Sequence, residues 1–331
     1  MREVLVTGGG GFVGSAIVRM LVEQGITTRI VGRNRYKNLE QLGATCLVGD
    51  IANKDFVEKS CRGVDTVIHT AAKAGIWGMW NEYYRTNVVG TKNIVETCRK
   101  LEIPRLVYTS TPTVVFNGLD IEGENEHLPY PSRFLCHYSK SKVMAEKIVL
   151  AATTATLRTC AIRPHLIWGP GDPHLIPRLI ERGKAKALKI VGSGKNFVDI
   201  TFIENVAHAH ILAAKSINNS AVAAGNPYFI GQERPVNLWN WINELYQELG
   251  IPVITARIPF RLAYAIGAML EVGYLLLKKS QEPPMTRFLA EQLSCNHYFS
   301  HDNAAHDLGY KPIISLEQGQ ERLMNWLTIG A

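Results

Sequence analysis

The order of apolar runs along the chain predicts an α/β fold built on a doubly wound parallel sheet. Short strand-like runs alternate with helical stretches, and the first run leads into a glycine-rich turn followed by a helical pattern. Strands joined in this way form right-handed crossovers, so helices bury both faces of the sheet. The first run is Val4-Leu5-Val6, and the later predicted strands are 28–32, 45–48, 66–70, 105–109 and 157–163.

The glycine-rich stretch at 7–14, T-G-G-G-G-F-V-G, lies between a predicted strand and a predicted helix. This is the context of a dinucleotide-binding turn, in which Gly8 permits the tight turn and Gly14 lets the helix pack closely on the strand. The positive end of the helix then faces the pyrophosphate. The pattern therefore predicts a Rossmann fold with these cofactor contacts: Gly8, Gly11, Phe12, Val13 and Gly14.

Residues after the next three strands indicate which cofactor the turn would hold. An NAD site usually has an acidic side chain after the second strand to bind the ribose hydroxyls, but here Gly32 is followed by Arg33. A guanidinium at this place can pair with a 2′-phosphate, so NADP(H) is the preferred cofactor and NAD(H) an accepted one. The alternative is a solvated loop arginine. Further predicted cofactor contacts are Asp50 and Ile51 after the third strand, and Ala71 and Ala72 after the fourth.

Composition and charge disfavour several classes of function. The 331 residues are 46% hydrophobic and 20% charged, an ordinary soluble composition. The net charge is +7, but the basic residues are spread along the chain apart from a cluster at 33–37, so an anionic ligand is a simpler expectation than nucleic acid. The six cysteines show no metal-binding spacing, and no signal peptide precedes the first strand. We therefore expect a cytoplasmic protein with reduced thiols.

Tyr138 and Lys142 lie four residues apart at the start of a predicted helix, so their side chains share one face. An ammonium stabilises a phenolate, and each unit of pKa depression corresponds to about 1.4 kcal/mol. The lysine and a cationic nicotinamide are therefore expected to bring the tyrosine pKa toward neutral pH. This spacing alone is common on helix surfaces. Combined with the glycine turn and the Ser/Thr-rich stretch at 109–113, it predicts a catalytic pair.

Together these motifs resemble those of the extended short-chain dehydrogenases/reductases over nearly the whole chain. The matching pieces are T-G-x-x-G-F-x-G at 7–14, N-V-V-G-T at 87–91, the Ser/Thr stretch at 109–113, the Tyr138/Lys142 pair and R-P-H-L-I-W-G-P-G at 163–171. The resemblance implies that Tyr138 is the acid/base and that Lys142 binds ribose and tunes the tyrosine. It also implies that Thr111 hydrogen-bonds the substrate oxygen, with Ser110 and Thr113 as alternatives because serine is commoner at this position.

Within this family the chain is more similar to the 3β-hydroxysteroid dehydrogenase branch than to the sugar-nucleotide branch. The segments 72–78, 110–115 and 120–123 are similar to those of 2-alkyl-3-oxoalkanoate reductases of bacterial olefin synthesis, and the branch also includes sterol-4-carboxylate 3-dehydrogenases. Their substrates share a carbonyl or hydroxyl two carbons from a carboxyl group, with a large apolar body. The resemblance therefore implies NADPH-dependent reduction of a β-keto carbonyl in a small apolar keto/hydroxy substrate.

Side chains around the predicted site agree with an apolar substrate. Trp77 and Trp80 follow the fourth strand, where substrate would lie, although simple core packing is an equal alternative. Thr113 is a further predicted substrate contact. Pro164 and His165 follow a strand end and are expected near the nicotinamide, with His165 also near the substrate, although a structural role for this histidine is equally compatible.

The segment 262–277 is apolar except for Glu271, and its sixteen residues would form a helix of about 24 Å, shorter than the ~30 Å hydrocarbon layer of a membrane. The segment is therefore not expected to span a membrane. A buried helix, a lid over an acyl-chain pocket and a surface-seeking segment remain alternatives. Arg261 and Lys278-Lys279 flank it, so peripheral membrane contact through 261–279 is one expectation. The expected assembly is a homodimer.

Residues 1–171 are expected to form the dinucleotide-binding domain with the Tyr/Lys pair. Residues 172–331 are expected to form mainly a smaller α/β substrate-binding region, with short strands at 196–203 and 228–231 and some segments returning to the Rossmann core. His208 and His210 are two residues apart on a predicted helix and point to different faces, so no metal is predicted.

Three alternatives to the reductase remain open. They are a 3β-hydroxysteroid or sterol-4-carboxylate 3-dehydrogenase, a nucleotide-sugar epimerase or dehydratase, and a non-catalytic NADP-binding sensor. The intact Tyr138/Lys142 pair argues against the sensor, since a sensor needs no proton donor.

Overall fold

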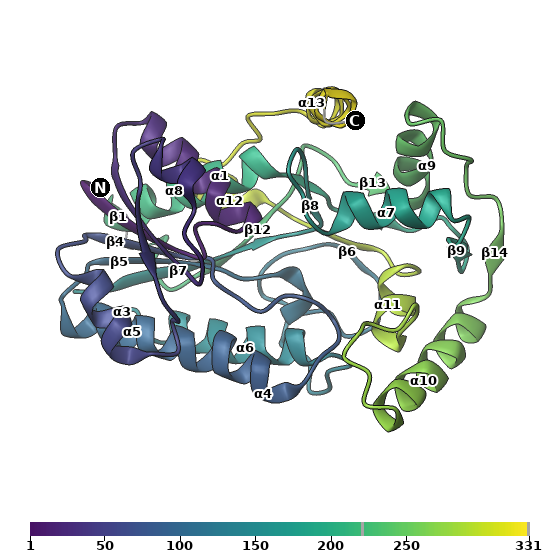
Figure 1. Cartoon of the computed structure of the whole chain (residues 1–331), viewed down its shortest axis with the longest axis horizontal. Coiled ribbons are helices and arrows are strands. Elements are labelled where there is room, and N and C mark those ends of the chain that lie inside the picture. The colour runs from purple at the N-terminus through teal and green to yellow at the C-terminus, as the bar shows by residue number, and fades with distance from the viewer. Residues whose placement is uncertain (220–221, 330–331) are drawn as a thin grey trace.

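A seven-stranded parallel sheet forms the centre of the protein in a computed structural model that describes residues 1–219 and 222–329 (Figure 1). The strand order is β12-β7-β5-β4-β1-β2-β3, so the chain winds outward in both directions from β1 and β4. The strands are β1 (Glu3–Thr7), β2 (Thr27–Gly32), β3 (Thr45–Val48), β4 (Thr66–His69), β5 (Arg105–Thr109), β7 (Arg158–Pro164) and β12 (Pro227–Ile230). This order confirms the predicted doubly wound Rossmann fold.

Helices cover both faces of this sheet (Figure 1). Val4 and Val6 of β1 belong to the core shared with α1 and α8, whereas Leu5 belongs to the core shared with α3 and α5, because successive side chains of a strand point to opposite faces. One layer contains α1 (Phe12–Glu23), α8 (Ile203–Asn219) and α12 (Asp302–Leu308), and the other α3 (Lys54–Cys61), α5 (Gly90–Lys100) and α6 (His137–Leu150).

The predicted strands of the main sheet agree with the observed ones to within one residue at each end. The central strands β1, β4, β5 and β7 are almost entirely buried, and a buried parallel strand needs the largely apolar run that the sequence displays there. The predicted strand at 228–231 is β12, which pairs in parallel with β7 at the edge of the main sheet and therefore lies in the Rossmann core. The predicted strand at 196–203 is interrupted and forms β10 (Phe197–Val198) and β11 (Thr201–Phe202).

Short helical turns complete the Rossmann half. α2 (Lys37–Glu40) follows β2, and α4 (Trp80–Tyr83) continues through a π-helical turn (Tyr84–Val89) into α5. A 3₁₀ turn (Pro112–Val114) follows β5. The long segment between β4 and α5 therefore lies at the carboxyl ends of the strands, where ligands of such sheets bind.

The rest of the chain packs against this end of the sheet and occupies the right of Figure 1. A four-stranded sheet in the order β13-β10-β15-β6 takes one strand from residues 121–124 and the others from the second half of the chain. The elements are β6 (Ile121–Glu124), β8 (Ile167–Trp168), α7 (Leu175–Lys184), β9 (Ile190–Val191), β13 (Val236–Asn237), α9 (Leu238–Glu248), β14 (Arg257–Ile258), α10 (Phe260–Leu276), α11 (Arg287–Gln292), β15 (His297–Phe299) and α13 (Leu316–Ile329).

Candidate active site

The glycine-rich turn between β1 and α1 is shaped by close backbone contacts. Gly8 has a φ of 67°, and a Cβ on it would lie 2.8 Å from the Cα of Ala71. A Cβ on Gly14 would lie 2.2 Å from the carbonyl oxygen of Gly8, so a side chain at either position would displace backbone. Gly11 is the N-cap of α1 and supplies no capping side chain, which leaves the N–H groups of the first turn for an anion.

Phe12 and Val13, the first residues of α1, are half-buried and pack against the core of the C-terminal region. They therefore join the start of α1 to the part of the chain expected to hold substrate. A buried glycine cradle at a helix N-terminus fits the pyrophosphate of a dinucleotide.

The segment after β2 folds back over the glycine turn. The ring of Tyr36 lies against Gly10 and Gly32, where a Cβ would come within 2.0 Å and 2.7 Å of ring atoms, respectively. Arg35 pairs with Glu40 at 2.8 Å. Arg33 is exposed, and the described residues offer its guanidinium no ion-pair or hydrogen-bond partner. An unpaired cation beside the dinucleotide turn is the arrangement that a 2′-phosphate would need.

The side chain of Asp50 after β3 is held by protein groups. It accepts a hydrogen bond from the backbone N–H of Ala52 at 2.9 Å and pairs with Arg85 at 2.7 Å. Ile51 is buried in the core between α3 and α5, where its side chain packs on Gly90. Any contact between these two residues and a cofactor would therefore use the outer edge of the Asp50 carboxylate or the backbone.

The backbone after β4 is fixed next to the glycine turn. The N–H of Ala71 donates to the hydroxyl of Thr7 at 3.3 Å, and Ala72 is exposed. The amide of Asn87 holds the next residue, since it accepts from the N–H of Lys73 at 2.7 Å and donates to its carbonyl at 3.1 Å. The side chain of Asn87 therefore fixes the backbone after β4, and Ala71 and Ala72 remain small side chains where a cofactor would pass.

Lys142 lies one helical turn after Tyr138 on α6, and its ammonium is buried. It donates to the carbonyl oxygen of Thr109 at 2.5 Å and lies 4.1 Å from the ring centroid of Tyr108. Burial lowers the pKa of Lys142 to about 7, and the carboxylate of Glu146 opposes this shift. The amine is therefore aimed at the end of β5, beside the Ser/Thr stretch.

Tyr138 is half-buried and lies close to Thr111. Burial raises the pKa of Tyr138 to about 12, the neighbouring Cys136 adds to this rise, and a hydrogen bond with the Thr111 side chain lowers it. In the protein without cofactor, desolvation therefore outweighs the stabilisation of a phenolate, and the lowering of the pKa by Lys142 together with a cationic nicotinamide stays a prediction. The phenol keeps its proton at neutral pH, as a proton donor must.

The three hydroxyl candidates after β5 have different surroundings. The side chains of Thr111 and Tyr138 are in contact. The hydroxyl oxygen of Thr111 also lies 3.2 Å from the hydroxyl oxygen of Thr113. The hydroxyl of Ser110 is buried without a hydrogen-bond partner among the described residues. Thr111 therefore has the geometry of a second contact to the oxygen that Tyr138 would protonate, with Thr113 directly behind it.

A buried ion pair behind Lys142 was not predicted from the sequence. Glu146 follows Lys142 by one more turn of α6 and receives two hydrogen bonds from Arg163, at 2.6 Å and 3.0 Å. The hydroxyl of Tyr130 donates to the same carboxylate at 2.8 Å. Glu146 is fully buried, and Arg163 is 1% exposed. An acidic residue four positions after Lys142 on the same buried face was the available signal.

The two predicted substrate tryptophans have separate neighbours. Trp77 donates from its indole N–H to the carbonyl of Lys279 at 3.1 Å and packs edge-on against Tyr274 of α10. Trp80 packs against His137, the residue before Tyr138, at 5.6 Å between ring centroids. Trp77 therefore lies against α10, and Trp80 lies against the first turn of α6.

A small cavity of about 150 Å³ lies beside the start of α6. It is lined by Phe116, Asn117, Arg133, Phe134, Leu135, Ser139, Tyr264, Phe288 and Glu291. Ser139 directly follows Tyr138 in the chain, so the cavity borders the first turn of α6. Its walls combine aromatic and aliphatic side chains with Asn117, Arg133, Ser139 and Glu291, which suits a ligand that has both an apolar part and an acidic group.

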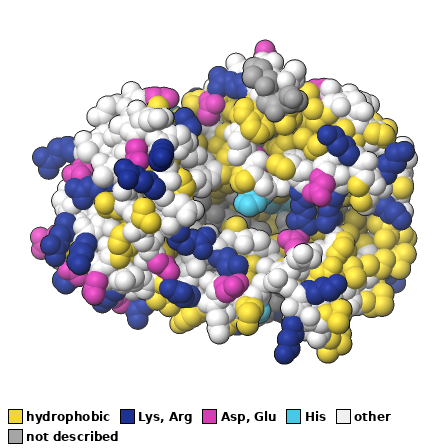
Figure 2. All heavy atoms as spheres, in the orientation of Figure 1, with side chains coloured by type: hydrophobic (Ala, Val, Ile, Leu, Met, Phe, Trp, Pro, Cys, Tyr) yellow, Lys and Arg dark blue, Asp and Glu magenta, His cyan; other side chains and the backbone are white. Residues whose placement is uncertain are grey.

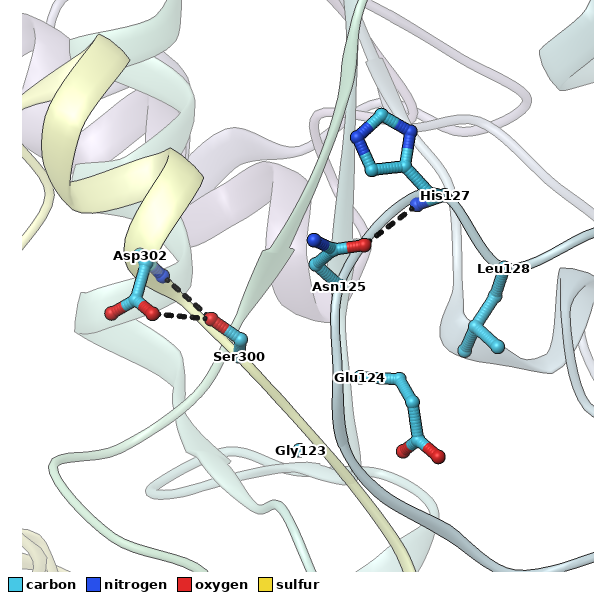
Figure 3. Close-up of a pocket in the computed structure, with 7 residues that line it drawn as sticks. All are labelled: Gly123, Glu124, Asn125, His127, Leu128, Ser300 and Asp302. Atoms are coloured by element: carbon cyan, nitrogen blue, oxygen red, sulfur yellow. Dashed lines mark hydrogen bonds between the residues drawn. The ribbon is translucent and has the colours of Figure 1, made fainter.

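A larger hollow of about 530 Å³ lies elsewhere, between the segment after β6 and the start of α12 (Figure 3). Its lining is polar: Ser300 donates to the carboxylate of Asp302, and the side chain of Asn125 accepts from the backbone of His127. None of the predicted site residues lines it. It is open to the surface, and neither Tyr138 nor Lys142 lines it.

His165 lies directly after β7 and is paired with another histidine. Its Nε2 is 2.6 Å from Nδ1 of His297, whose own Nε2 is 2.7 Å from the carbonyl oxygen of Gln292. Burial and the neighbouring His297 hold the pKa of His165 well below its usual range. Pro164 ends β7 as a buried strand residue paired with Ile230. Sequence reasoning missed His297, which is far away in the chain.

His208 and His210 have different surroundings, as expected for two residues that point to different faces of a helix. His210 is buried and lies 2.7 Å from both the hydroxyl of Thr109 and the carbonyl oxygen of Val206, whereas His208 is half-buried. Across residues 1–219 and 222–329, no group of three or more His, Cys, Asp or Glu side chains is arranged to hold a metal ion.

Comparison with known proteins agrees with this geometry. Residues 5–261 match the 3-beta hydroxysteroid dehydrogenase/isomerase family. The 2-alkyl-3-oxoalkanoate reductase of Shewanella oneidensis is 46% identical, over 98% of this chain and 86% of its own. The protein of the same name from Stenotrophomonas maltophilia is 44% identical, over 97% of this chain and 98% of its own.

A solved structure extends the likeness to the whole fold. MoeE5, determined in complex with UDP-glucose and NAD, superposes with a TM-score of 0.74 at 25% identity and covers 99% of each chain. The match confirms the doubly wound architecture.

Proposed function

Because the chain belongs to the 3-beta hydroxysteroid dehydrogenase/isomerase family, we propose that it reduces the 3-oxo group of a 2-alkyl-3-oxoalkanoate-like lipid, with NADPH as the hydride donor. Family membership makes it an NAD(P)-dependent oxidoreductase of the short-chain dehydrogenase/reductase kind. The observation that carries the proposal is the contact between the side chains of Tyr138 and Thr111, beside a cavity lined by both aromatic and charged side chains. The names of the relatives at 46% and 44% identity support the substrate class.

The cofactor would lie across the glycine cradle and the carboxyl ends of β1, β2 and β4. Bound NADPH supplies a hydride to the carbonyl carbon. The N-terminus of α1 would bind the pyrophosphate, and Arg33 the 2′-phosphate. Lys142, which is buried at the end of β5, would bind a ribose hydroxyl. Each of these groups belongs to the backbone or to a side chain whose surroundings fit an anionic or polyhydroxyl ligand.

The proton would come from Tyr138. Its hydroxyl donates to the carbonyl oxygen as negative charge develops there, and the hydroxyl of Thr111 donates a second hydrogen bond to the same oxygen. The raised pKa of Tyr138, about 12, keeps the donor protonated at neutral pH. In reverse, the same tyrosine accepts the proton of the alcohol.

The substrate panel tests this function directly. We expect NADPH oxidation with 2-alkyl-3-oxo acids to exceed that with nucleotide sugars by about 10²-fold or more in kcat/KM, because the small cavity combines aromatic contacts for an alkyl chain with an arginine for a carboxylate. Keto steroids test the sterol alternative in the same assay. Preferred turnover of a nucleotide sugar would contradict the proposal, and NADPH binding without turnover of any class would favour the sensor.

Arg133 is the cationic side chain in the cavity lining and is expected to bind the substrate carboxylate. We expect Arg133→Gln to lower kcat/KM for a 3-oxo acid by about tenfold, mainly through KM, because the lost contact forms in both ground and transition states. The methyl ester of the same acid has no carboxylate and is the control. An equal loss for acid and ester would show that Arg133 does not recognise this group.

Arg33 is expected to set the cofactor preference. Arg33→Asp should raise the Kd of NADPH by about 10- to 100-fold, because it removes a cation and adds repulsion of the 2′-phosphate, while changing the Kd of NADH by less than about threefold. Arg35→Gln is the matched control, since the Arg35 guanidinium is already paired with Glu40. Titration of tryptophan fluorescence measures both constants, and an equal loss for both cofactors would contradict this role.

A further inference from the structure

Helix α10 has an unusual distribution of side chains, because its buried face is small and polar. Ala263, Gly267 and Glu271, at successive turns, face α11. A Cβ on Gly267 would lie 2.6 Å from the carbonyl carbon of Thr286, so the two elements touch at backbone distance. Glu271 receives hydrogen bonds from the backbone N–H and the Nε of Arg287, both at 2.7 Å. The polar groups of this face are hydrogen-bonded and its backbone is closely packed without any contribution from large apolar residues.

Several large apolar residues of α10 lie on the opposite, exposed face. Leu262 is 51% exposed, Met269 66%, Val272 57% and Leu276 78%. Their spacing of seven, three and four residues places them along one side of the helix. Leu275 and Leu277 extend the row at the C-terminal end. Apolar side chains gather at the lower right of Figure 2, over the position of α10 in Figure 1, and a continuous patch of this kind indicates a binding surface.

Cations lie at both ends of this apolar row. Arg261 precedes it, and Lys278 and Lys279 follow it, all exposed. Glu271 is the acidic residue within the helix, and it is buried and neutralised by Arg287. The next acid, Glu282, is paired with Arg178. The exposed side of α10 therefore combines apolar surface with net positive charge.

We propose that α10 docks this protein on the surface of an anionic lipid bilayer. Its 17 residues give a length of about 25 Å, and no helix in the described part of the chain is long and apolar enough to cross a membrane. A helix with one apolar face and terminal cations lies in the interface plane, with its apolar side chains among the acyl chains and its cations at the anionic headgroups.

A second copy of the chain fits this surface less well. Two α10 helices packed antiparallel about a two-fold axis would bring Arg261 of each copy next to Lys278 and Lys279 of the other. Packed in parallel, each cation would meet its own counterpart. Since the exposed face of α10 offers no acid to offset either repulsion, charge favours a lipid surface over self-association.

Docking would also bring the cavity next to Tyr138 close to lipid. Tyr264, on the inner side of α10, lines this cavity, and Lys279 after α10 accepts the hydrogen bond from Trp77. A lipid substrate could then reach the cavity along α10. This consequence rests on the proposed function, whereas docking itself does not, and it can be measured without turnover.

Flotation with lipid vesicles tests the docking. We expect the full chain to float with vesicles of phosphatidylcholine and phosphatidylglycerol at low salt, less at high salt, and weakly with phosphatidylcholine alone. Met269→Glu is expected to weaken binding by at least about tenfold because it places a charge in the apolar row. Lys278→Gln is expected to weaken binding to anionic vesicles by about fivefold.

The control is Trp326→Glu. Trp326 is 43% exposed on α13, which lies at the top of Figure 1 whereas α10 lies at the lower right, and its replacement should leave flotation unchanged. Retained melting temperature and turnover of a short soluble 3-oxo acid will show that each variant is folded. These activity readings also separate a failure of docking from a failure of the proposed reductase function.

The proposal is overturned if the wild type does not float with anionic vesicles, or if Trp326→Glu loses as much binding as Met269→Glu. It is also overturned if Met269→Glu converts a dimer to a monomer, by light scattering, while the wild type shows no lipid binding. That result would assign the surface to a second copy.

Discussion

We expect Tyr138→Phe to lower turnover by about 10²–10⁴ while leaving the affinity for NADPH nearly unchanged. Phenylalanine keeps the ring at the start of α6 and deletes only the hydroxyl that donates the proton. The contribution is large because the phenol, with a pKa of about 12, is protonated at neutral pH and lies next to the Thr111 hydroxyl that would share the substrate oxygen. Steady-state kinetics with a 2-alkyl-3-oxo acid and cofactor titration measure the two quantities.

Thr111→Val is the graded comparison. Valine is nearly isosteric and removes one hydrogen bond to the developing alkoxide, so turnover should fall less than in Tyr138→Phe because the proton route remains. Near-normal turnover of Tyr138→Phe would place the acid elsewhere. His165 would then be the next group to test, although its ring is already engaged by His297 at 2.6 Å.

The sheet and the cofactor cradle were predictable because local residue patterns determine them. A strand buried on both faces requires a continuous apolar run, and each such run in the first half of the chain became a strand of the main sheet. Gly8 and Gly14 were predictable for a related reason, since only glycine fits where backbone approaches within 2.8 Å and 2.2 Å of the position of a Cβ.

The groups that tune the catalytic pair were less predictable because they meet through tertiary packing. Arg163 and Glu146 belong to different elements, and nothing in their spacing along the sequence indicates that they form an ion pair. The sequence also places Lys142 near Tyr138, but it does not show that the amine is turned to the carbonyl of Thr109. The rise in the pKa of Tyr138 in the protein without cofactor could not be foreseen from the sequence, since the extent of desolvation depends on the finished fold.

The sequence could not show which face of α10 is buried, for a similar reason. Its composition is compatible with burial, a lid or a surface role, because apolar residues occur all around the helix. The small residues at 263 and 267 and the carboxylate at 271 form the face that packs on α11. Burial of that carboxylate is possible because Arg287 pairs with it. A simple buried helix is therefore excluded, since the large side chains remain exposed.

The second large effect is expected from Arg163→Met, which should lower the free energy of unfolding by about 3–5 kcal/mol. The substitution leaves the fully buried carboxylate of Glu146 without its cation, and the hydroxyl of Tyr130 alone cannot replace two charge-assisted hydrogen bonds. Urea denaturation followed by circular dichroism measures the loss. Arg322→Met is the matched control, because Arg322 pairs with Glu204 at the same 2.6 Å but with both side chains exposed, and it should cost about 0–1 kcal/mol.

The double variant Glu146→Gln/Arg163→Met separates pairing from simple loss of packing. Once the carboxylate is neutral, no buried charge is left unpaired, so the double variant should be more stable than Arg163→Met alone. Additive losses, or a cost of Arg163→Met no larger than that of Arg322→Met, would show that the pair contributes little. Because Glu146 lies one turn beyond Lys142 and opposes the fall in its pKa, Glu146→Gln should also shift the lysine toward its neutral form. The ion pair would then support the fold and the charge state of the catalytic lysine through the same carboxylate.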